Sequence, residues 1–427
     1  MINAISLKAY IKKVSPNTFI LIAIEVIRRG SLFIIGLMLA RTSGKDIFGL
    51  FSYSLSFGTF LFLLSDFGIS RFIIRELSRS KELLKNVVNT LIPLKIAISC
   101  TAFGIFVIAV YQLKIPAGLH VPILLSGIYL VIRSFKQSLV AIFISSGRIN
   151  EILVTTVIQN TLLLFLAFSV YARIMSLESM FACMIISALA GTLISIALIS
   201  KHLGALRLLV DIAFYKSILK DSLPFAQTAI LATLHTKVSV LCLGTMKGFS
   251  DTAVFSAADN FTLTLLVFIT VFGTSIAPTM SSYCKHAFLR FRSYLRSTLI
   301  VVIGLSIFMA LTINLFSRKI VTFFYGMDFA YSANALNFLI WSLLFLNINV
   351  ILGIALESMD KAGLVPLCQI TIILVTLLLN LYLIPGLGVL GACLATLLGN
   401  LVGIFLLGFF VRKNIVLCIA KDGTGNP

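Results

Sequence analysis

Apolar residues run along this chain in long blocks, and polar residues fall mainly between the blocks. An apolar run of about 20 residues crosses the hydrocarbon core of a membrane as a helix, because its backbone hydrogen bonds are then all made internally. The runs are 18–40, 47–69, 87–111, 121–145, 152–171, 179–199, 223–243, 253–277, 298–316, 335–356, 365–384 and 390–410. The pattern predicts an all-α integral membrane protein of about 12 transmembrane helices.

The runs fall into two sets of six, separated by a basic, amphipathic stretch. We expect an N-terminal six-helix lobe at 1–200, a cytoplasmic amphipathic linker at 201–221, a C-terminal six-helix lobe at 222–412 and a cytoplasmic tail at 413–427. A weak repeat supports this division, since Phe51-Ser52 recurs as Phe255-Ser256. Repeated bundles of this kind are typical of transporters.

Prolines and glycines mark places where the helices should end or approach closely. We expect Pro224 to open the seventh helix and Pro278 to close the eighth, because proline lacks a backbone N–H. Gly399 and Gly403, four residues apart, indicate close helix packing.

The composition agrees with a lipid environment, with 59% hydrophobic and 11% charged residues. In a soluble protein the net charge of +19 would favour nucleic acid as the partner. The distribution of the charge along the chain decides whether this interpretation applies here. The termini and the loops on their side hold 21 Lys and Arg, and the opposite loops hold 7. The positive-inside rule therefore places both termini in the cytoplasm, and topology explains the charge without nucleic acid.

The remaining basic residues lie inside predicted spans and carry the most information. They are Arg28, Arg29, Lys95, Arg133, Lys136 and Lys237. A cation at the centre of a membrane helix costs about 2.5–3.5 kcal/mol, so each needs a partner or water. Arg29 and Arg133 lie at the midpoints of their spans, too deep to reach an interface easily.

Few acidic residues are available in the membrane to pair with these cations. Glu25 precedes Arg28 and Arg29 by three and four residues, which is the spacing of an ion pair on one helix face. Asp66 and Asp259 are the other candidates. Because cations exceed acids, we predict a central, water-filled, electropositive cavity suited to an anionic substrate. In the alternative, Glu25 forms a buried packing pair with Arg28 or Arg29, and Arg133 with Lys136 reaches an interface.

Several classes of function lack their motifs in this sequence. There is no phosphate-binding loop for ATP, no nucleophile elbow and no closely spaced His/Cys cluster, so we expect no cofactor, no metal and no enzyme activity. A membrane polysaccharide polymerase or glycosyltransferase would need longer external loops. A multidrug or cation antiporter would need buried acids in excess, and the charge balance here is the reverse. Both stay open as alternatives.

The motifs of the whole chain, in their order and spacing, resemble the bacterial Wzx-type polysaccharide flippases, which transport lipid-linked O-antigen units. The matching segments are Leu39-Ala40-Arg41, Phe48-Gly49-Leu50-Phe51, Asp66-Phe67-Gly68-Ile69, Arg75-Glu76-Leu77, Gly147-Arg148, Pro224, Ala253-Val254-Phe255-Ser256, Met359-Asp360-Lys361 and Ile384-Pro385-Gly386-Leu387-Gly388. Relatives often carry an acid before the lysine of the seventh span, whereas here Thr236 precedes Lys237.

The resemblance implies two six-helix lobes around a central cavity in the bacterial inner membrane. It implies that the substrate is an undecaprenyl-pyrophosphate-linked glycan, flipped from the cytoplasmic to the periplasmic leaflet by alternating access. Joined with the charge pattern, it assigns the pyrophosphate to the six intramembrane cations and the coupling of H⁺ or Na⁺ to Glu25, Asp66 and Asp259. Polysaccharide polymerase and chain-length proteins are possible partners. Glycan contacts are expected among polar residues of the spans, such as Gln159, Asn160, Asn260, Asn347 and Asn349.

Overall fold

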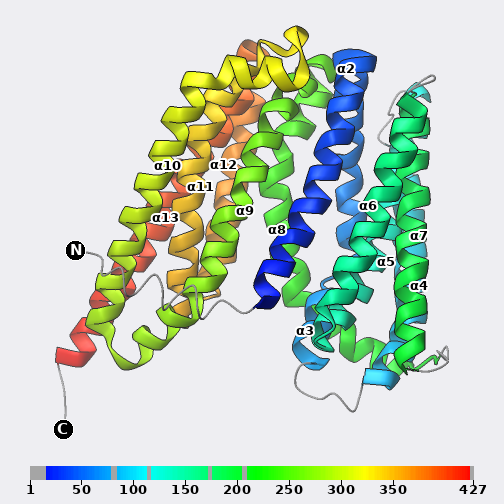
Figure 1. The fold of residues 1–427 in the computed structure, drawn as a ribbon. Coiled ribbons are helices and arrows are strands. Elements are labelled where there is room, and N and C mark those ends of the chain that lie inside the picture. The colour runs from blue at the N-terminus through cyan, green and yellow to red at the C-terminus, as the bar shows by residue number, and fades with distance from the viewer. Residues whose placement is uncertain (1–15, 78–83, 113–116, 172–175, 204–208, 424–427) are drawn as a thin grey trace. The chain divides into compact units, whose positions relative to one another are not determined.

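A computed structural model describes residues 16–77, 84–112, 117–171, 176–203 and 209–423, and within these ranges the chain is α-helical with short turns. The α-helices are α2 Pro16–Asp66, α3 Ile69–Leu77, α4 Leu84–Gln112, α5 His120–Ser145, α6 Ile149–Tyr171, α7 Leu177–Leu203, α8 Ile212–Met246, α9 Phe249–His286, α10 Phe288–Tyr325, α11 Ser332–Ser358, α12 Leu364–Leu387 and α13 Val389–Gly423 (Figure 1). Two single 3-10 turns, Ala117–Leu119 and Met327–Phe329, precede α5 and α11.

The predicted all-α membrane fold is confirmed. Ten helices, α4 to α13, are long and apolar enough to cross a membrane. The first two predicted spans are joined in α2, which is interrupted at Gly44 with φ 79° and ψ −175°. This backbone conformation favours glycine, because a Cβ would strain it. The break separates α2 into two segments, each of which corresponds to one apolar run.

The structure corrects the expected roles of the two prolines. Pro224 lies inside α8, which begins 12 residues earlier at Ile212, and Pro278 lies inside α9, which continues to His286. Each proline removes one hydrogen bond from its helix, and the flanking turns continue the helix around it. α10 has 38 residues and is about 57 Å long at 1.5 Å per residue, well beyond the hydrocarbon core.

The chain divides into two compact units. Unit 1 holds the described residues up to Ser43 and from Ser54 to Thr233; unit 2 holds Gly44–Tyr53 and the described residues from Leu234 onward. In unit 1, α5 packs against α3, α4 and α7, and α6 packs against α7. The apolar face of α3, with Ile69, Phe72, Ile73 and Leu77, is buried in a cluster with side chains of α4 and α5.

A sharp turn connects α2 to α3 and contacts α8. Phe67 and Gly68 both have positive φ, at 46° and 72°. A Cβ on Gly68 would lie 2.6 Å from the backbone nitrogen of Ala226 and 2.7 Å from the carbonyl oxygen of Ser222. Glycine is therefore required at this position by both conformation and space.

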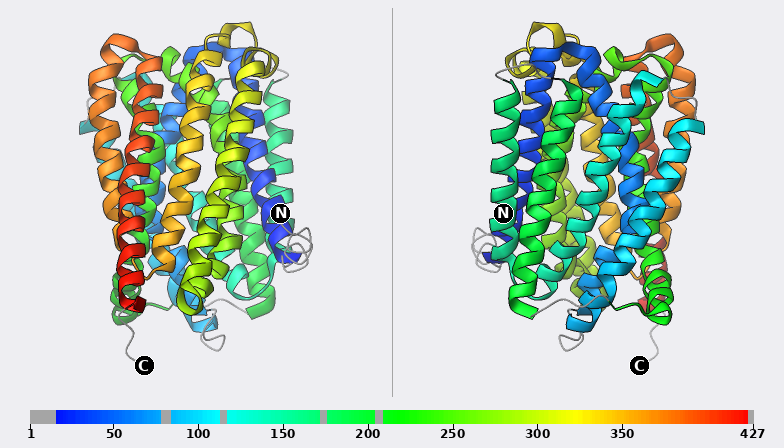
Figure 2. Two further views of the ribbon diagram at one scale, coloured as in Figure 1. Left: turned by 90° about the vertical axis from the view of Figure 1, so that its left-hand side faces the viewer. Right: turned by 90° about the vertical axis from the view of Figure 1, so that its right-hand side faces the viewer.

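In unit 2, α9 to α13 run side by side (Figures 1 and 2). α11 packs against α9, α10 and α13, and α12 packs against α13. The predicted close packing at the two glycines of α13 is confirmed: a Cβ on Gly399 would collide with Thr376, and one on Gly403 with Asn349 and Ile372. The two glycines therefore let both α11 and α12 pack closely against α13.

Candidate functional site

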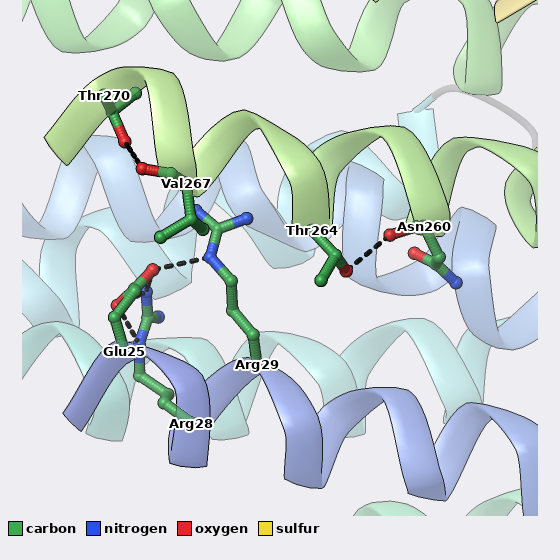
Figure 3. A network of polar contacts seen from close by, with 7 residues as sticks. All are labelled: Glu25, Arg28, Arg29, Asn260, Thr264, Val267 and Thr270. Atoms are coloured by element: carbon green, nitrogen blue, oxygen red, sulfur yellow. Dashed lines mark hydrogen bonds and ion pairs between the residues drawn. The ribbon is translucent and has the colours of Figure 1, made fainter. Parts of the chain in front are cut away.

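Three charged residues on one face of α2 form the first part of the candidate site, as Figure 3 shows. Arg28 donates from Nε and Nη2 to both carboxylate oxygens of Glu25, at 3.0 and 2.6 Å. Arg29 Nε donates to Glu25 Oε1 at 2.6 Å. The arginine side chains are 36% exposed, so these ion pairs are partly open to the surroundings. The predicted pair is confirmed, but one carboxylate serves two guanidinium groups.

Arg133 of α5 adds a third guanidinium group to this site. Its Cζ atom lies 5.6 Å from the centre of the Phe62 ring on α2, which is cation–π distance. The charges of Glu25, Arg28 and Arg29 all act on it. Within the part of the chain that the structure describes, no acid pairs with Arg133 and no group accepts a hydrogen bond from it. An unsatisfied guanidinium in a membrane protein is costly, so its donors must be occupied by water or by a ligand.

Lys136 lies one helical turn after Arg133 and is 9% exposed. Its ammonium group donates a hydrogen bond to Gln159 Oε1 of α6. The charge of Arg28 also acts on it. Among the described residues no carboxylate pairs with Lys136, so the amide holds its charge without neutralising it.

We call Glu25, Arg28, Arg29, Arg133 and Lys136 the cation cluster. It contains four cations and one acid, a net charge of +3. Three guanidinium groups and an ammonium in partly buried surroundings bind phosphate oxygens well, because guanidinium groups pair them bidentately. The chemistry that this arrangement supports is anion binding.

Lys95, assigned to the same group of cations from the sequence, has a different environment. It is 1% exposed, and its Nζ atom donates to the Ser65 carbonyl oxygen at 2.8 Å and to Asp66 Oδ1 at 3.1 Å. Ser70 also donates to Asp66 Oδ1, at 2.5 Å. Its contacts therefore satisfy Lys95 within α2 and α4, which favours a packing role over contact with a substrate.

Lys237 and Asp259, the remaining assigned residues, belong to unit 2. The charge of Lys237 acts on Asp259, and Thr262 Oγ1 donates to Asp259 Oδ1 at 3.1 Å. Asp259 lines a cavity formed by α8, α9, α11 and α13. On α9, Thr264 and Thr270 donate to backbone carbonyl oxygens of their own helix, which Figure 3 also shows.

A hydrogen-bonded network surrounds this cavity. His235 and Asn400 are joined at 3.0 Å, and Asn400 Nδ2 donates to Ser342 at 2.9 Å. The hydroxyl oxygens of Ser239 and Thr396 are joined by a hydrogen bond of 3.0 Å. A carboxylate beside an imidazole and several hydroxyl and amide oxygens is a set that suits a proton or a small monovalent cation. The sequence analysis missed His235 and Asn400, because single polar residues in apolar runs give no sign of sharing a cavity.

Polar residues expected to contact a glycan mostly have partners on neighbouring helices. Asn347 Nδ2 donates to Ser306 and Asn349 Nδ2 to the carbonyl oxygen of Asn400, while Asn160 Nδ2 donates to its own helix. Only the amide of Gln159 joins the cation cluster among the five named. Within the described ranges, no group of three or more His, Cys, Asp or Glu residues is arranged to hold a metal.

Comparison with known structures identifies the fold. A multidrug resistance MATE family transporter of the MOP superfamily, inward-facing, matches with a TM-score of 0.70 at 14% identity, covering 91% of this chain and 94% of that chain. The lipid II flippase MurJ, in an inward closed conformation, also matches with a TM-score of 0.70 at 16% identity, covering 92% of this chain and 89% of that chain. A MOP superfamily transporter from Pyrococcus furiosus, reported to have a binding pocket of reverse polarity, matches at 0.65 with 14% identity and 95% of both chains. The chain therefore has the all-α fold of these MATE and MurJ structures.

The family follows from the sequence comparison. The model of the polysaccharide biosynthesis protein family matches residues 14–284, and the MatE model matches residues 224–385. None of the curated proteins matches this chain in sequence. The chain belongs to the polysaccharide biosynthesis protein family, and the resemblance to polysaccharide flippases is confirmed.

Proposed function

We propose that this protein is a flippase that moves an undecaprenyl-pyrophosphate-linked oligosaccharide, the O-antigen repeat unit, from the cytoplasmic to the periplasmic leaflet of a bacterial inner membrane. The observation that carries the proposal is the guanidinium group of Arg133. It lies in a cluster of net charge +3, and no group of the described chain accepts its hydrogen bonds. An anionic headgroup would supply the missing acceptors.

A pyrophosphate matches the cation cluster in charge and in chemistry. It carries two or three negative charges, and its oxygens accept bidentate hydrogen bonds from arginine. The lipid tail would stay in the bilayer during transport, and the polar glycan would travel through water-filled space. No bond is made or broken, so the residues bind and release the substrate without catalysis.

The charge balance favours this substrate over the cationic drug of an antiporter. A positively charged drug would be repelled by the cluster, whose four cations exceed its one carboxylate. The repulsion is about 3 kcal/mol for each unpaired charge at about 5 Å and an effective dielectric constant of about 20. The Pyrococcus furiosus transporter is reported to have a binding pocket of reverse polarity, so the same fold accommodates pockets of different polarity. A multidrug antiporter is therefore the second candidate, supported by the MATE fold and by the match of the MatE model to residues 224–385.

Transport across the bilayer would follow alternating access driven by an ion gradient. In the proposed cycle the cation cluster takes up the diphosphate from the cytoplasmic side, and a conformational change then opens it to the periplasm. Asp259 and His235, in the polar cavity of unit 2, are the residues we propose for coupling to H⁺ or Na⁺. Glu25 already accepts hydrogen bonds from two cations, and Asp66 accepts them from one cation and one hydroxyl group. These contacts make both carboxylates less suitable for binding a coupling ion.

The test is deletion of this gene in its host, followed by assay of surface polysaccharide and of lipid-linked single repeat units. Loss of polymer with accumulation of complete units on the cytoplasmic face supports the flippase. Loss of polymer while units still reach the periplasm would instead assign the protein to polymerisation. An unchanged glycan would leave the antiporter as the better proposal.

A further inference from the structure

Lys136 is held in the cation cluster by an uncharged partner. The residue is 9% exposed and its ammonium group donates to Gln159 Oε1, whereas Lys95, the other buried lysine among the described residues of unit 1, pairs with Asp66. A buried lysine is normally paired with an acid, because its charge is costly without one. An amide oxygen orients the ammonium group and leaves its full positive charge in the cluster.

The amide of Gln159 is itself held in place by a glycine of α7. A Cβ built on Gly191 would lie 2.6 Å from Gln159 Oε1 and 3.0 Å from its Cβ and Cδ atoms. The backbone of α7 therefore passes directly against the glutamine side chain. With α5 on one side and α7 on the other, the amide has little freedom to turn.

The orientation of this amide follows from the chemistry of lysine. An ammonium group only donates, so the carbonyl end of the amide must face Lys136 and the NH₂ end must point elsewhere. Within the described ranges, no group accepts a hydrogen bond from Gln159 Nε2. Contact of the oxygen with a cation polarises the amide and makes its NH₂ a stronger donor.

We propose that Gln159 is a positioning and specificity-determining residue of the diphosphate site. It fixes the Lys136 ammonium group without cancelling its charge and offers its own NH₂ to the same anion. This inference rests on the proposed function. It adds a requirement that the residue be a neutral amide, because a carboxylate of the same shape would bind Lys136 as an ion pair and lower the net charge of the cluster from +3 to +2.

The experiment measures binding of undecaprenyl pyrophosphate to the purified full-length protein in nanodiscs. Gln159→Glu is expected to raise Kd about 30-fold, and Gln159→Met, which removes both contacts but no charge, about fivefold. With undecaprenyl monophosphate, which carries less charge, the loss in Gln159→Glu should shrink to less than about tenfold. Gln112→Glu, at the exposed end of α4, is the matched control and should bind as the wild type does.

A merely structural role for Gln159 would make the two substitutions equivalent, so equal losses in Gln159→Glu and Gln159→Met overturn the proposal. Binding within twofold of wild type in Gln159→Glu overturns it as well. If Gln159→Glu does not fold, Gly191→Ala, which displaces the amide without adding charge, should raise Kd about threefold, and unchanged binding would refute the role.

Failure of the proposed function gives a different pattern of results. In that case the wild type would not bind undecaprenyl pyrophosphate, and Arg133→Ala would make no difference. If the wild type binds and Arg133→Ala weakens binding while Gln159→Glu does not, only the role of Gln159 is refuted.

Discussion

Replacing Arg133 by alanine removes one of the four cations of the cation cluster. The net charge of the cluster falls from +3 to +2, and one guanidinium fork is lost. At a separation of about 5 Å and an effective dielectric constant of about 20, one charge pair contributes about 3 kcal/mol. We therefore expect Kd for undecaprenyl pyrophosphate to rise about 100-fold and surface polysaccharide to be lost.

Arg133→Lys keeps the charge but not the fork, so we expect it to bind about tenfold more weakly than wild type and to retain part of the activity. The amount of protein in the membrane should not change in either variant, because no described acid is left unpaired when Arg133 is removed. Arg318→Ala, an exposed arginine on α10, is the matched control and should produce normal polymer.

The outcome that would refute this reasoning is normal surface polysaccharide in the double variant Arg29→Ala, Arg133→Ala. That result would remove the cation cluster from the mechanism. Loss of the Arg133→Ala protein from the membrane would indicate that the arginine serves the fold, and the effect on transport would then carry no information about binding.

Three further predictions test other parts of the structure. Lys95→Ala leaves Asp66 without its cation and should lower the free energy of unfolding by about 3–5 kcal/mol, measured as a lower Tm in detergent. The double variant Lys95→Met, Asp66→Asn should recover most of this loss, and no recovery would argue against the ion pair. Gly68→Ala should cost at least about 2 kcal/mol through its positive φ and its contacts with α8, while Gly104→Ala, which has open space, should leave Tm within a few degrees. Asp259→Asn should abolish ion-driven transport but leave Kd for undecaprenyl pyrophosphate unchanged, and weaker binding would contradict a coupling role.

The apolar runs predicted the membrane helices because a helix in lipid must be apolar along its whole buried length. The same rule does not reveal helix ends in water. α3 begins where the second apolar run ends and continues into a polar segment, so the run does not reveal it; Arg71 and Arg75 lie exposed on this helix. Its apolar residues at 69, 72, 73 and 77 have helical spacing, so the signal was present in the sequence.

The candidate site shows a similar division between local and distant contacts. The pairs of Glu25 with Arg28 and Arg29 could be predicted, because residues three and four apart share a helix face. The contacts of Lys95 with Asp66 and of Lys136 with Gln159 join different helices, and helix packing alone decides them. One sequence gives no information on which buried cation meets an acid and which meets an amide.

The Lys95–Asp66 pair also bears on the order in which the chain enters the membrane. Asp66 ends α2, which is synthesised before α4, and it is available when Lys95 emerges 29 residues later. Alone in lipid, the lysine would oppose integration of α4 by up to about 3 kcal/mol. Integration of α4 should therefore depend on an earlier helix: in a chain truncated after α4, Asp66→Asn should reduce the fraction of molecules that retain this helix in the bilayer.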